Sequence, residues 1–209
     1  MGTALFDNQA VPATPAAGKS RLFVDSTAKK LVVLDDTGRG NPVGGIDNGS
    51  VASQTPFATD TYVTDSDLII PSVGLQIRTY LRWEISATKT AAGVATPIYR
   101  IRLGSARTTA DTAILTITGP AQTAAIDGAV ITVFATLRNV GASAVLQGTT
   151  SMVHNLAATG FANNAAGMVE ATSGTFDSTG KAGQFFGLSI DGGASAAWTV
   201  TRVRSRMDW

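Results

Sequence analysis

Apolar and polar residues alternate along most of the chain from about residue 67 onward, and this alternation predicts β-strands. The clearest case runs from Gln76 to Ser86. One set of positions there holds Ile77, Thr79, Leu81, Trp83 and Ile85, and the other set holds Gln76, Arg78, Tyr80, Arg82 and Glu84. A period of two over ten residues suits a strand, because successive side chains of a strand point to opposite faces.

The same pattern predicts seven further strands, at residues 98–103, 113–118, 129–138, 144–153, 167–171, 184–190 and 197–203. Turn residues separate them, among them Asp127-Gly128, Asn163-Asn164 and Asp191-Gly192-Gly193. No stretch longer than ten residues has a convincing helical period. About eight strands without helices between them predict an all-β fold, an antiparallel β-sandwich of the jelly-roll kind.

The first 45 residues predict a separate attachment segment. Residues 1–18 contain Pro12 and Pro15, which favour an extended arm whose Leu5 and Phe6 we expect to dock on a partner. Two apolar runs, 21–25 and 30–35, predict a β-hairpin. Two strands alone are marginal in water, so the hairpin requires a third strand, a symmetry mate or a partner surface.

Residues 36–66 are rich in turn residues and predict a connector with little regular structure. We therefore divide the chain into an arm and hairpin (1–45), a linker (46–66) and a β-sandwich domain (67–209). The partner-binding residues predicted in the first segment are Leu5, Phe6, Arg21, Leu22, Phe23, Val32 and Leu34.

Composition narrows the possible functions. The chain has 209 residues, of which Gly, Ala, Ser and Thr make up 97, and it has no cysteine, which excludes disulfides, thiolate metal sites and thiol catalysis. Its formal net charge is +1, which does not favour a nucleic-acid partner. There is no secretory signal pattern and no apolar run long enough to cross a membrane. We expect synthesis in the cytoplasm and no membrane association.

Residues capable of chemistry are few. His154 is the one histidine, and without a nucleophile-elbow motif we expect it to be a strand-end residue bonded to backbone or water. Glu84 lies beside Arg82, which favours an ion pair over a raised-pKa catalytic acid. The acidic clusters at 35–36 and 65–67 lack the calcium-loop motif. We predict no enzymatic activity, no cofactor and no metal.

Arginines recur two or four residues apart, at Arg78 with Arg82, at Arg100 with Arg102, and at Arg202, Arg204 and Arg206. Such spacing places the side chains of a strand on one face. These rows could bind acidic glycans or nucleic acid. The low net charge and the few aromatic residues alongside favour instead a set of Arg–Asp pairs between subunits or sheets.

Two parts of the chain resemble proteins of tailed-phage particles. Residues 16–25 (AAGKSRLFVD) and 30–38 (KLVVLDDTG) resemble a hairpin near the start of many phage virion proteins, although the glycine of its first turn is replaced here by Ser26–Lys29. Residues 80–85, 118–123, 154–157 and 194–200 resemble the sandwich of phage head-decoration (cement) and fibre proteins.

This resemblance implies a non-enzymatic virion protein on the capsid surface. The first expectation is a homotrimeric decoration protein that binds the major capsid protein through its N-terminal segment and stabilises the assembled head. The alternative is a head or tail fibre component whose sandwich binds a host surface glycan. A free bacterial carbohydrate-binding or adhesion module, and a polysaccharide-cleaving enzyme that uses His154 or Glu84, are further alternatives.

Overall fold

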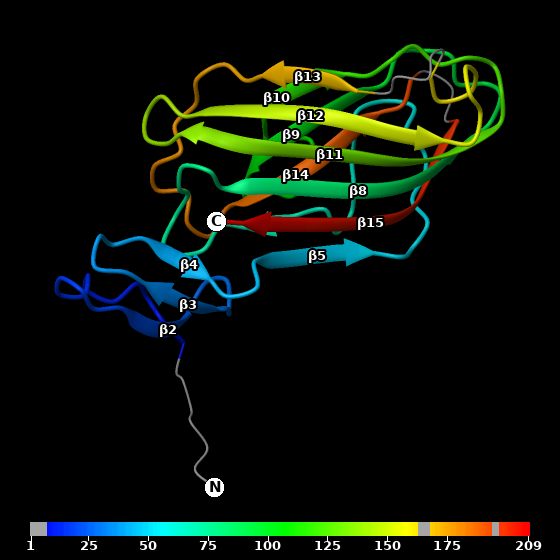
Figure 1. Cartoon of the computed structure of the whole chain (residues 1–209). Coiled ribbons are helices and arrows are strands. Elements are labelled where there is room, and N and C mark those ends of the chain that lie inside the picture. The colour runs from blue at the N-terminus through cyan, green and yellow to red at the C-terminus, as the bar shows by residue number, and fades with distance from the viewer. Residues whose placement is uncertain (1–7, 163–167, 194–196) are drawn as a thin grey trace, which may run out of the picture.

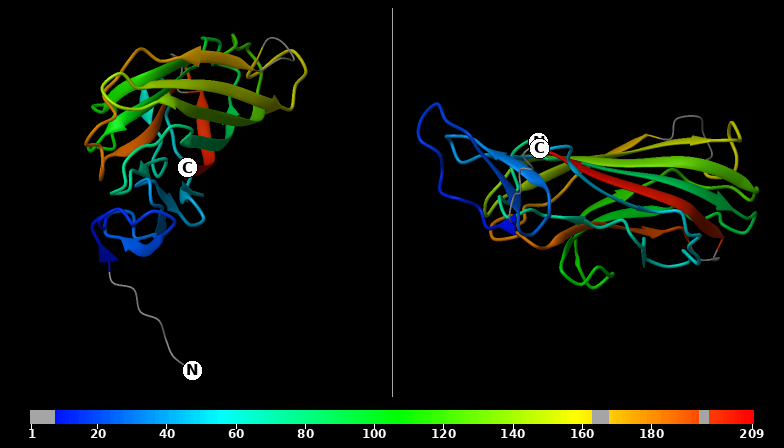
Figure 2. Two further views of the ribbon diagram at one scale, coloured as in Figure 1. Left: turned by 60° about the vertical axis from the view of Figure 1, so that its left-hand side comes forward. Right: turned by 90° about the horizontal axis from the view of Figure 1, so that it is seen from below.

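Three β-sheets make up the part of the chain that the computed structural model describes, which is residues 8–162, 168–193 and 197–209 (Figure 1). No helix occurs among these residues, and hence none that could cross a membrane. Two of the sheets face each other as the layers of a sandwich, and the third, small sheet lies at one end (Figure 2). The all-β sandwich predicted from the alternation is confirmed.

The larger layer has six strands in the order β13-β12-β11-β8-β15-β5. Their bounds are β5 Ile46–Ser50, β8 Tyr80–Lys89, β11 Asp127–Asn139, β12 Val145–His154, β13 Val169–Thr172 and β15 Trp198–Asp208. The other layer has the order β10-β9-β14-β6, and β7 also pairs with β14. Its bounds are β6 Thr61–Tyr62, β7 Leu68–Ile69, β9 Ile98–Gly104, β10 Thr112–Thr118 and β14 Phe185–Asp191. All pairings in these two layers are antiparallel.

Successive strands cross between the layers in the pattern of a jelly roll. Along the chain β5, β8, β11 and β15 lie in the larger layer, and β6 with β7, β9 with β10, and β14 lie in the other. The last strand, β15, is inserted between β5 and β8, so distant parts of the sequence become neighbours, as in the two Greek keys of a jelly roll. The hairpin of β12 and β13 extends the larger layer beyond β11.

The core between the layers comes from the inward positions of each strand. On β8 these are Leu81, Trp83 and Ile85, all fully buried, as the alternation predicts. Trp83 also satisfies its indole N–H, which donates to the carbonyl of Ser66 at 2.7 Å. Phe161 packs edge-on against the buried Trp198, with ring centroids 4.7 Å apart, and closes one end of the core.

The expected start of the strand that became β8 is wrong. The strand expected from Gln76 begins at Tyr80, because Arg78 adopts a left-handed backbone (φ 75°) and Ile77 is 51% exposed. The turn that precedes the strand is held by Thr79, whose hydroxyl donates to the carbonyl of Gln76 at 2.8 Å. The alternation of apolar and polar residues therefore starts at Gln76, before the strand itself begins at Tyr80.

Residues 46–66, expected to form an irregular linker, belong to the sandwich. Their first part is β5, which pairs with β15 as an edge strand, and β6 pairs with β14 in the opposite layer. Asn48 and Gly49, which read as turn residues, lie within β5. An edge strand forms one ladder only and buries one face, so a weakly apolar sequence is sufficient to form it.

The small sheet has the order β1-β2-β3-β4, formed by Asn8–Gln9, Arg21–Asp25, Leu31–Leu34 and Gly40–Pro42. The predicted hairpin of β2 and β3 is confirmed, and β4 supplies the third strand that it requires. Lys29 takes the left-handed conformation (φ 55°) in the turn between β2 and β3, a conformation that glycine adopts most easily. The small sheet and the C-terminus lie at the same end of the sandwich (Figures 1 and 2).

Candidate functional site

The residues predicted to contact a partner separate into an interior and an exposed group. Phe23, Val32 and Leu34 have at most 1% of their surface exposed and form a small core of their own. Val73, from the loop between β7 and β8, packs against this core. A side chain without exposed surface cannot contact a partner, so these three residues stabilise the small sheet instead.

The exposed group consists of Arg21 and Leu22, of which Leu22 is 45% exposed. Val43 follows β4 and is 53% exposed. It lies among turn residues, so no alternating pattern around it predicts an exposed apolar side chain. Leu5 and Phe6 lie outside the described residues. The small sheet thus presents one basic and two apolar side chains from β2 and the end of β4.

Asp25 attaches the small sheet to the sandwich. Its carboxylate is fully buried, and Oδ1 accepts hydrogen bonds from the backbone N–H of Thr27 at 2.9 Å and of Ala28 at 2.7 Å. Oδ2 accepts one from the backbone N–H of Ser72, in the sandwich, at 2.9 Å. A second link is the side-chain amide of Gln76, which donates to the carbonyl of Gly40 at 2.6 Å. These contacts fix the orientation of the small sheet.

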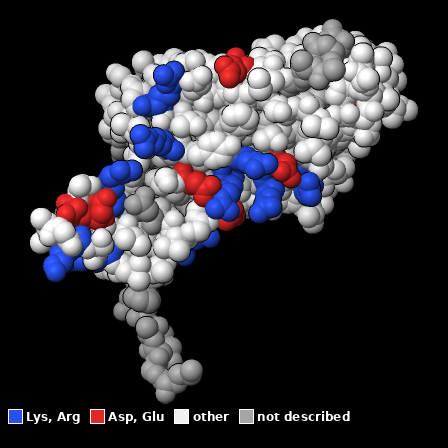
Figure 3. Space-filling model, in the orientation of Figure 1, with Lys and Arg blue, Asp and Glu red and all other residues white. Residues whose placement is uncertain are grey.

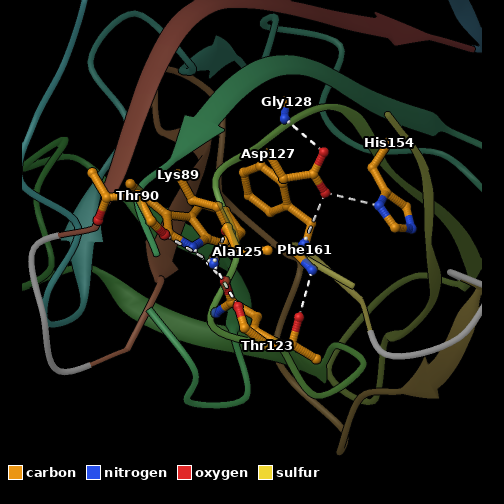
Figure 4. A network of polar contacts seen from close by, with 11 residues as sticks. Lys89, Thr90, Thr123, Ala125, Asp127, Gly128, His154 and Phe161 are labelled. Carbon is orange, nitrogen blue, oxygen red and sulfur yellow. Dashed lines mark hydrogen bonds and ion pairs between the residues drawn. The ribbon is translucent and has the colours of Figure 1, made fainter. Parts of the chain in front are cut away.

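A buried polar network at the opposite end of β8 contains the residues best suited to chemistry (Figure 4). Lys89 is 2% exposed, and its ammonium donates to three backbone carbonyls, those of Thr90 at 3.0 Å, Thr123 at 2.8 Å and Ala125 at 2.9 Å. Burial lowers the pKa of this lysine, and the nearby Asp127 carboxylate partly opposes that effect. Lys89 therefore holds the loop that leads into β11.

His154 and Asp127 form the second half of the network. The Nδ1 atom of His154 lies 2.9 Å from Oδ2 of Asp127, and the side chains are 7% and 0% exposed. The same oxygen accepts the backbone N–H of Phe161 at 3.0 Å, and Oδ1 accepts that of Gly128 at 2.8 Å. His154 was expected to bond to backbone or water, so a carboxylate partner corrects that expectation.

Burial disfavours the charged form of Asp127, but the hydrogen bonds from Phe161, His154 and Gly128 outweigh it, so the pKa of Asp127 is lowered. Among the described residues, Asp127 is the one hydrogen-bond partner of the His154 ring. A histidine–aspartate pair activates a nucleophile only when a hydroxyl or thiol lies within hydrogen-bond reach. In these residues the pair instead joins β11, β12 and the loop that carries Phe161.

The arginines that recur two or four residues apart in the sequence do not share one environment in the structure. Arg78 is separated from Arg82 by its left-handed backbone and does not lie on the strand. Arg102 is buried, and its guanidinium bonds to Asp60, to the Ser189 hydroxyl at 2.7 Å and to two backbone carbonyls; Arg100 pairs with the same Asp60 at 3.2 Å. These two arginines are structural.

Glu84 lies in the ion pair expected for it, 3.1 Å from Arg82, and its other oxygen lies 3.2 Å from Arg202. Of the acidic clusters, Asp35 accepts hydrogen bonds within its own turn, from Thr37 and Arg39. Over residues 8–162, 168–193 and 197–209, no three His, Cys, Asp or Glu side chains come together as a metal site would require.

Comparison with known proteins leaves the chain without an assigned family. No model of a known protein family matches the sequence, and no curated protein matches it.

Proposed function

We propose that the chain is a non-enzymatic structural protein of a tailed-phage particle, a trimeric decoration protein that binds the major capsid protein and stabilises the assembled head. The sequence resemblance given above suggests the class of particle. The observation that carries the proposal is the small sheet. It has a core of its own and exposes Leu22 and Val43. It also lies at one end of the sandwich (Figure 1).

The arrangement suits attachment by one end. Asp25 and the loop at Ser72 hold the small sheet against the sandwich, so a contact made by the sheet also orients the larger domain. Leu22 and Val43 are the apolar residues that a partner surface would cover. Arg21 is exposed too, but it precedes Leu22 on β2 and points to the opposite face of the strand. Apolar side chains of this kind form the buried centre of a protein interface.

Decoration would stabilise the head by mass action. A protein that binds the assembled shell and not its separated subunits stabilises the shell by about 2.7 kcal/mol per site when its free concentration is 100 times Kd. Chemistry at an active site is not needed for this role. The Ala-, Ser- and Thr-rich composition also permits close contact between copies in a homotrimer. Sedimentation of the purified chain at three times its 21.4 kDa mass is the expected result.

The test is binding of the purified chain to shells that lack it. Leu22→Ser and Val43→Ser remove apolar side chains from the proposed contact, and Val51→Ser is the matched control because Val51 is 86% exposed and follows β5 on the sandwich. Each of the first two should weaken binding about tenfold, since burial of such a side chain contributes roughly 1.5 kcal/mol. Equal affinity of all three variants would refute attachment through the small sheet.

A further inference from the structure

Charged side chains gather in one strip on the outer face of the larger layer, across β8, β15 and β5 (Figure 3). The strip contains a groove of about 340 Å³ lined by Tyr80, Arg82, Glu84, Arg204, Arg206 and Asp208, which we call the arginine groove. Beside it, the outward residues of β11 and β12 are mostly uncharged, such as Thr132, Thr136, Thr149 and Ser151. The groove is thus a local charged site on a largely neutral face.

The carboxylates of the strip are already engaged by three of its arginines. Glu84 bridges Arg82 and Arg202, at 3.1 and 3.2 Å. Asp208 accepts the Nε–H of Arg206 with both oxygens, at 3.0 and 2.8 Å, and Asp47 lies 3.7 Å from the same guanidinium. Three arginines and three carboxylates therefore balance one another.

Arg204 is the cation left over. It lies on the same face of β15 as Arg202 and Arg206, directly opposite Glu84 in the strand register. The Glu84 oxygens are nevertheless held by Arg82 and Arg202. Arg204 is exposed, and among the described residues no hydrogen bond or ion pair engages its guanidinium. A planar fork of donors at a groove is suited to bind a carboxylate through two parallel hydrogen bonds.

The rest of the lining selects the kind of carboxylate. Glu84 and Asp208 would repel a second carboxylate bound beside them, so the groove itself suits one carboxylate, on Arg204. Their oxygens can also accept hydrogen bonds from hydroxyls. The phenol of Tyr80 adds a further donor and acceptor at the groove. A ring that carries one carboxylate and several hydroxyls matches both parts of this lining. The volume is at the lower end of the range for small-molecule sites, roughly 300–1,000 Å³.

We propose that the arginine groove binds an acidic polysaccharide of the uronic-acid type, with the sugar carboxylate on Arg204 and sugar hydroxyls on Glu84, Asp208 and Tyr80. This assignment does not rest on the proposed role in the particle, because the groove lies on the outer face of the sandwich and the small sheet contributes no residue to its lining. It would give the sandwich a binding activity of its own.

The experiment is calorimetric titration of the full chain with a galacturonic-acid oligomer, a neutral galactose oligomer of the same length, and poly-glutamate. Arg204→Gln should weaken uronate binding at least tenfold, because a charge-assisted, two-bond contact is lost. The matched control is Arg138→Gln, which removes an exposed arginine from the same sheet face outside the groove and should change affinity less than twofold. Binding should weaken as salt is added.

Several results would overturn the assignment. They are no uronate binding by the wild-type chain, equal binding of the neutral oligomer, or unchanged affinity in Arg204→Gln. Preferential binding of poly-glutamate would reassign the groove to an acidic protein partner. Because Arg204 is exposed, its variant should keep the wild-type melting temperature, and shell binding by the same variant should stay unchanged. A failure here is thereby distinguished from a failure of the decoration proposal.

Discussion

Replacement of Asp25 by asparagine should loosen the small sheet from the sandwich. The carboxylate is fully buried and accepts hydrogen bonds on both oxygens, two of them from the turn that follows β2 and two from Ser72. Asparagine has nearly the same size but places an NH₂ group where one oxygen stood. If Oδ1 keeps its partners in the turn, the new NH₂ faces the backbone N–H of Ser72.

The size of the effect follows from these contacts. A hydrogen bond to a charged group contributes roughly 1.5–3 kcal/mol, and a buried donor left without an acceptor costs about 1–3 kcal/mol. One such bond is lost at Ser72, and the bonds that remain at the turn lose the charge of their acceptor. We expect a net destabilisation of about 2–4 kcal/mol, concentrated on the opening of the small sheet.

Amide hydrogen exchange measures that opening directly. Exchange of the amides in β2 and β3 should accelerate roughly 30- to 1,000-fold, since each 1.4 kcal/mol is a factor of ten. Amides of β11, in the middle of the sandwich, should change little. The control is Asp36→Asn. The Asp36 carboxylate is exposed, and among the described residues its one hydrogen-bond donor is the backbone N–H of Gly18, so this substitution should change stability by less than about 0.5 kcal/mol.

The reasoning fails if Asp25→Asn and Asp36→Asn leave the exchange of β2 and β3 equally unchanged. Equal acceleration in every sheet would contradict it in another way. In that case the small sheet would open only together with the sandwich, and would not be a unit attached through Asp25.

Three other predictions concern the sandwich. Folding lowers the pKa of Asp127, so the contribution of this carboxylate to stability is present above about pH 4 and is lost as the pH falls through the folded value. The stability of Asp127→Asn, measured by urea unfolding, should therefore depend less on pH between 3 and 7 than that of the wild type. An unchanged pH dependence would contradict this role of Asp127. Lys89→Met should destabilise the chain by about 2–4 kcal/mol, because three carbonyl acceptors lose their buried donor. Unfolding of this variant at the wild-type melting temperature would refute a stabilising role of Lys89. Gly187→Ala should lower the free energy of unfolding by roughly 1–3 kcal/mol, because the added carbon would overlap the phenol of Tyr62. Gly174→Ala is the control, since open space surrounds Gly174, and should be close to neutral. Equal chemical denaturation midpoints of the two variants would contradict the prediction, because they would show that Tyr62 moves aside freely.

The sequence predicts best those strands that are buried on one face. The inward residues of β8, such as Leu81 and Trp83, alternate with polar ones because a solvated outer face requires polar residues. The hairpin of the small sheet is predictable for a similar reason, since Phe23 and Val32 form a local apolar core. In both cases neighbouring residues carry the signal.

Features set by distant residues could not be predicted in this way. Strand β5 is formed by its pairing with β15, about 150 residues further along the chain, and its own sequence reads as a turn. His154 and Asp127 meet because β11 pairs with β12, a register that neither sequence segment contains alone. Within the described part of the chain Arg204 likewise has no ion pair because Arg82 and Arg202 already hold the oxygens of Glu84, and these neighbours come from two different strands.

The copy number of the chain in purified phage particles tests the central claim most directly. It can be measured by quantitative mass spectrometry against the major capsid protein. Decoration of the head predicts a number comparable with that of the capsid protein. A handful of copies would contradict decoration and favour a fibre component, and complete absence of the chain would contradict a role in the particle.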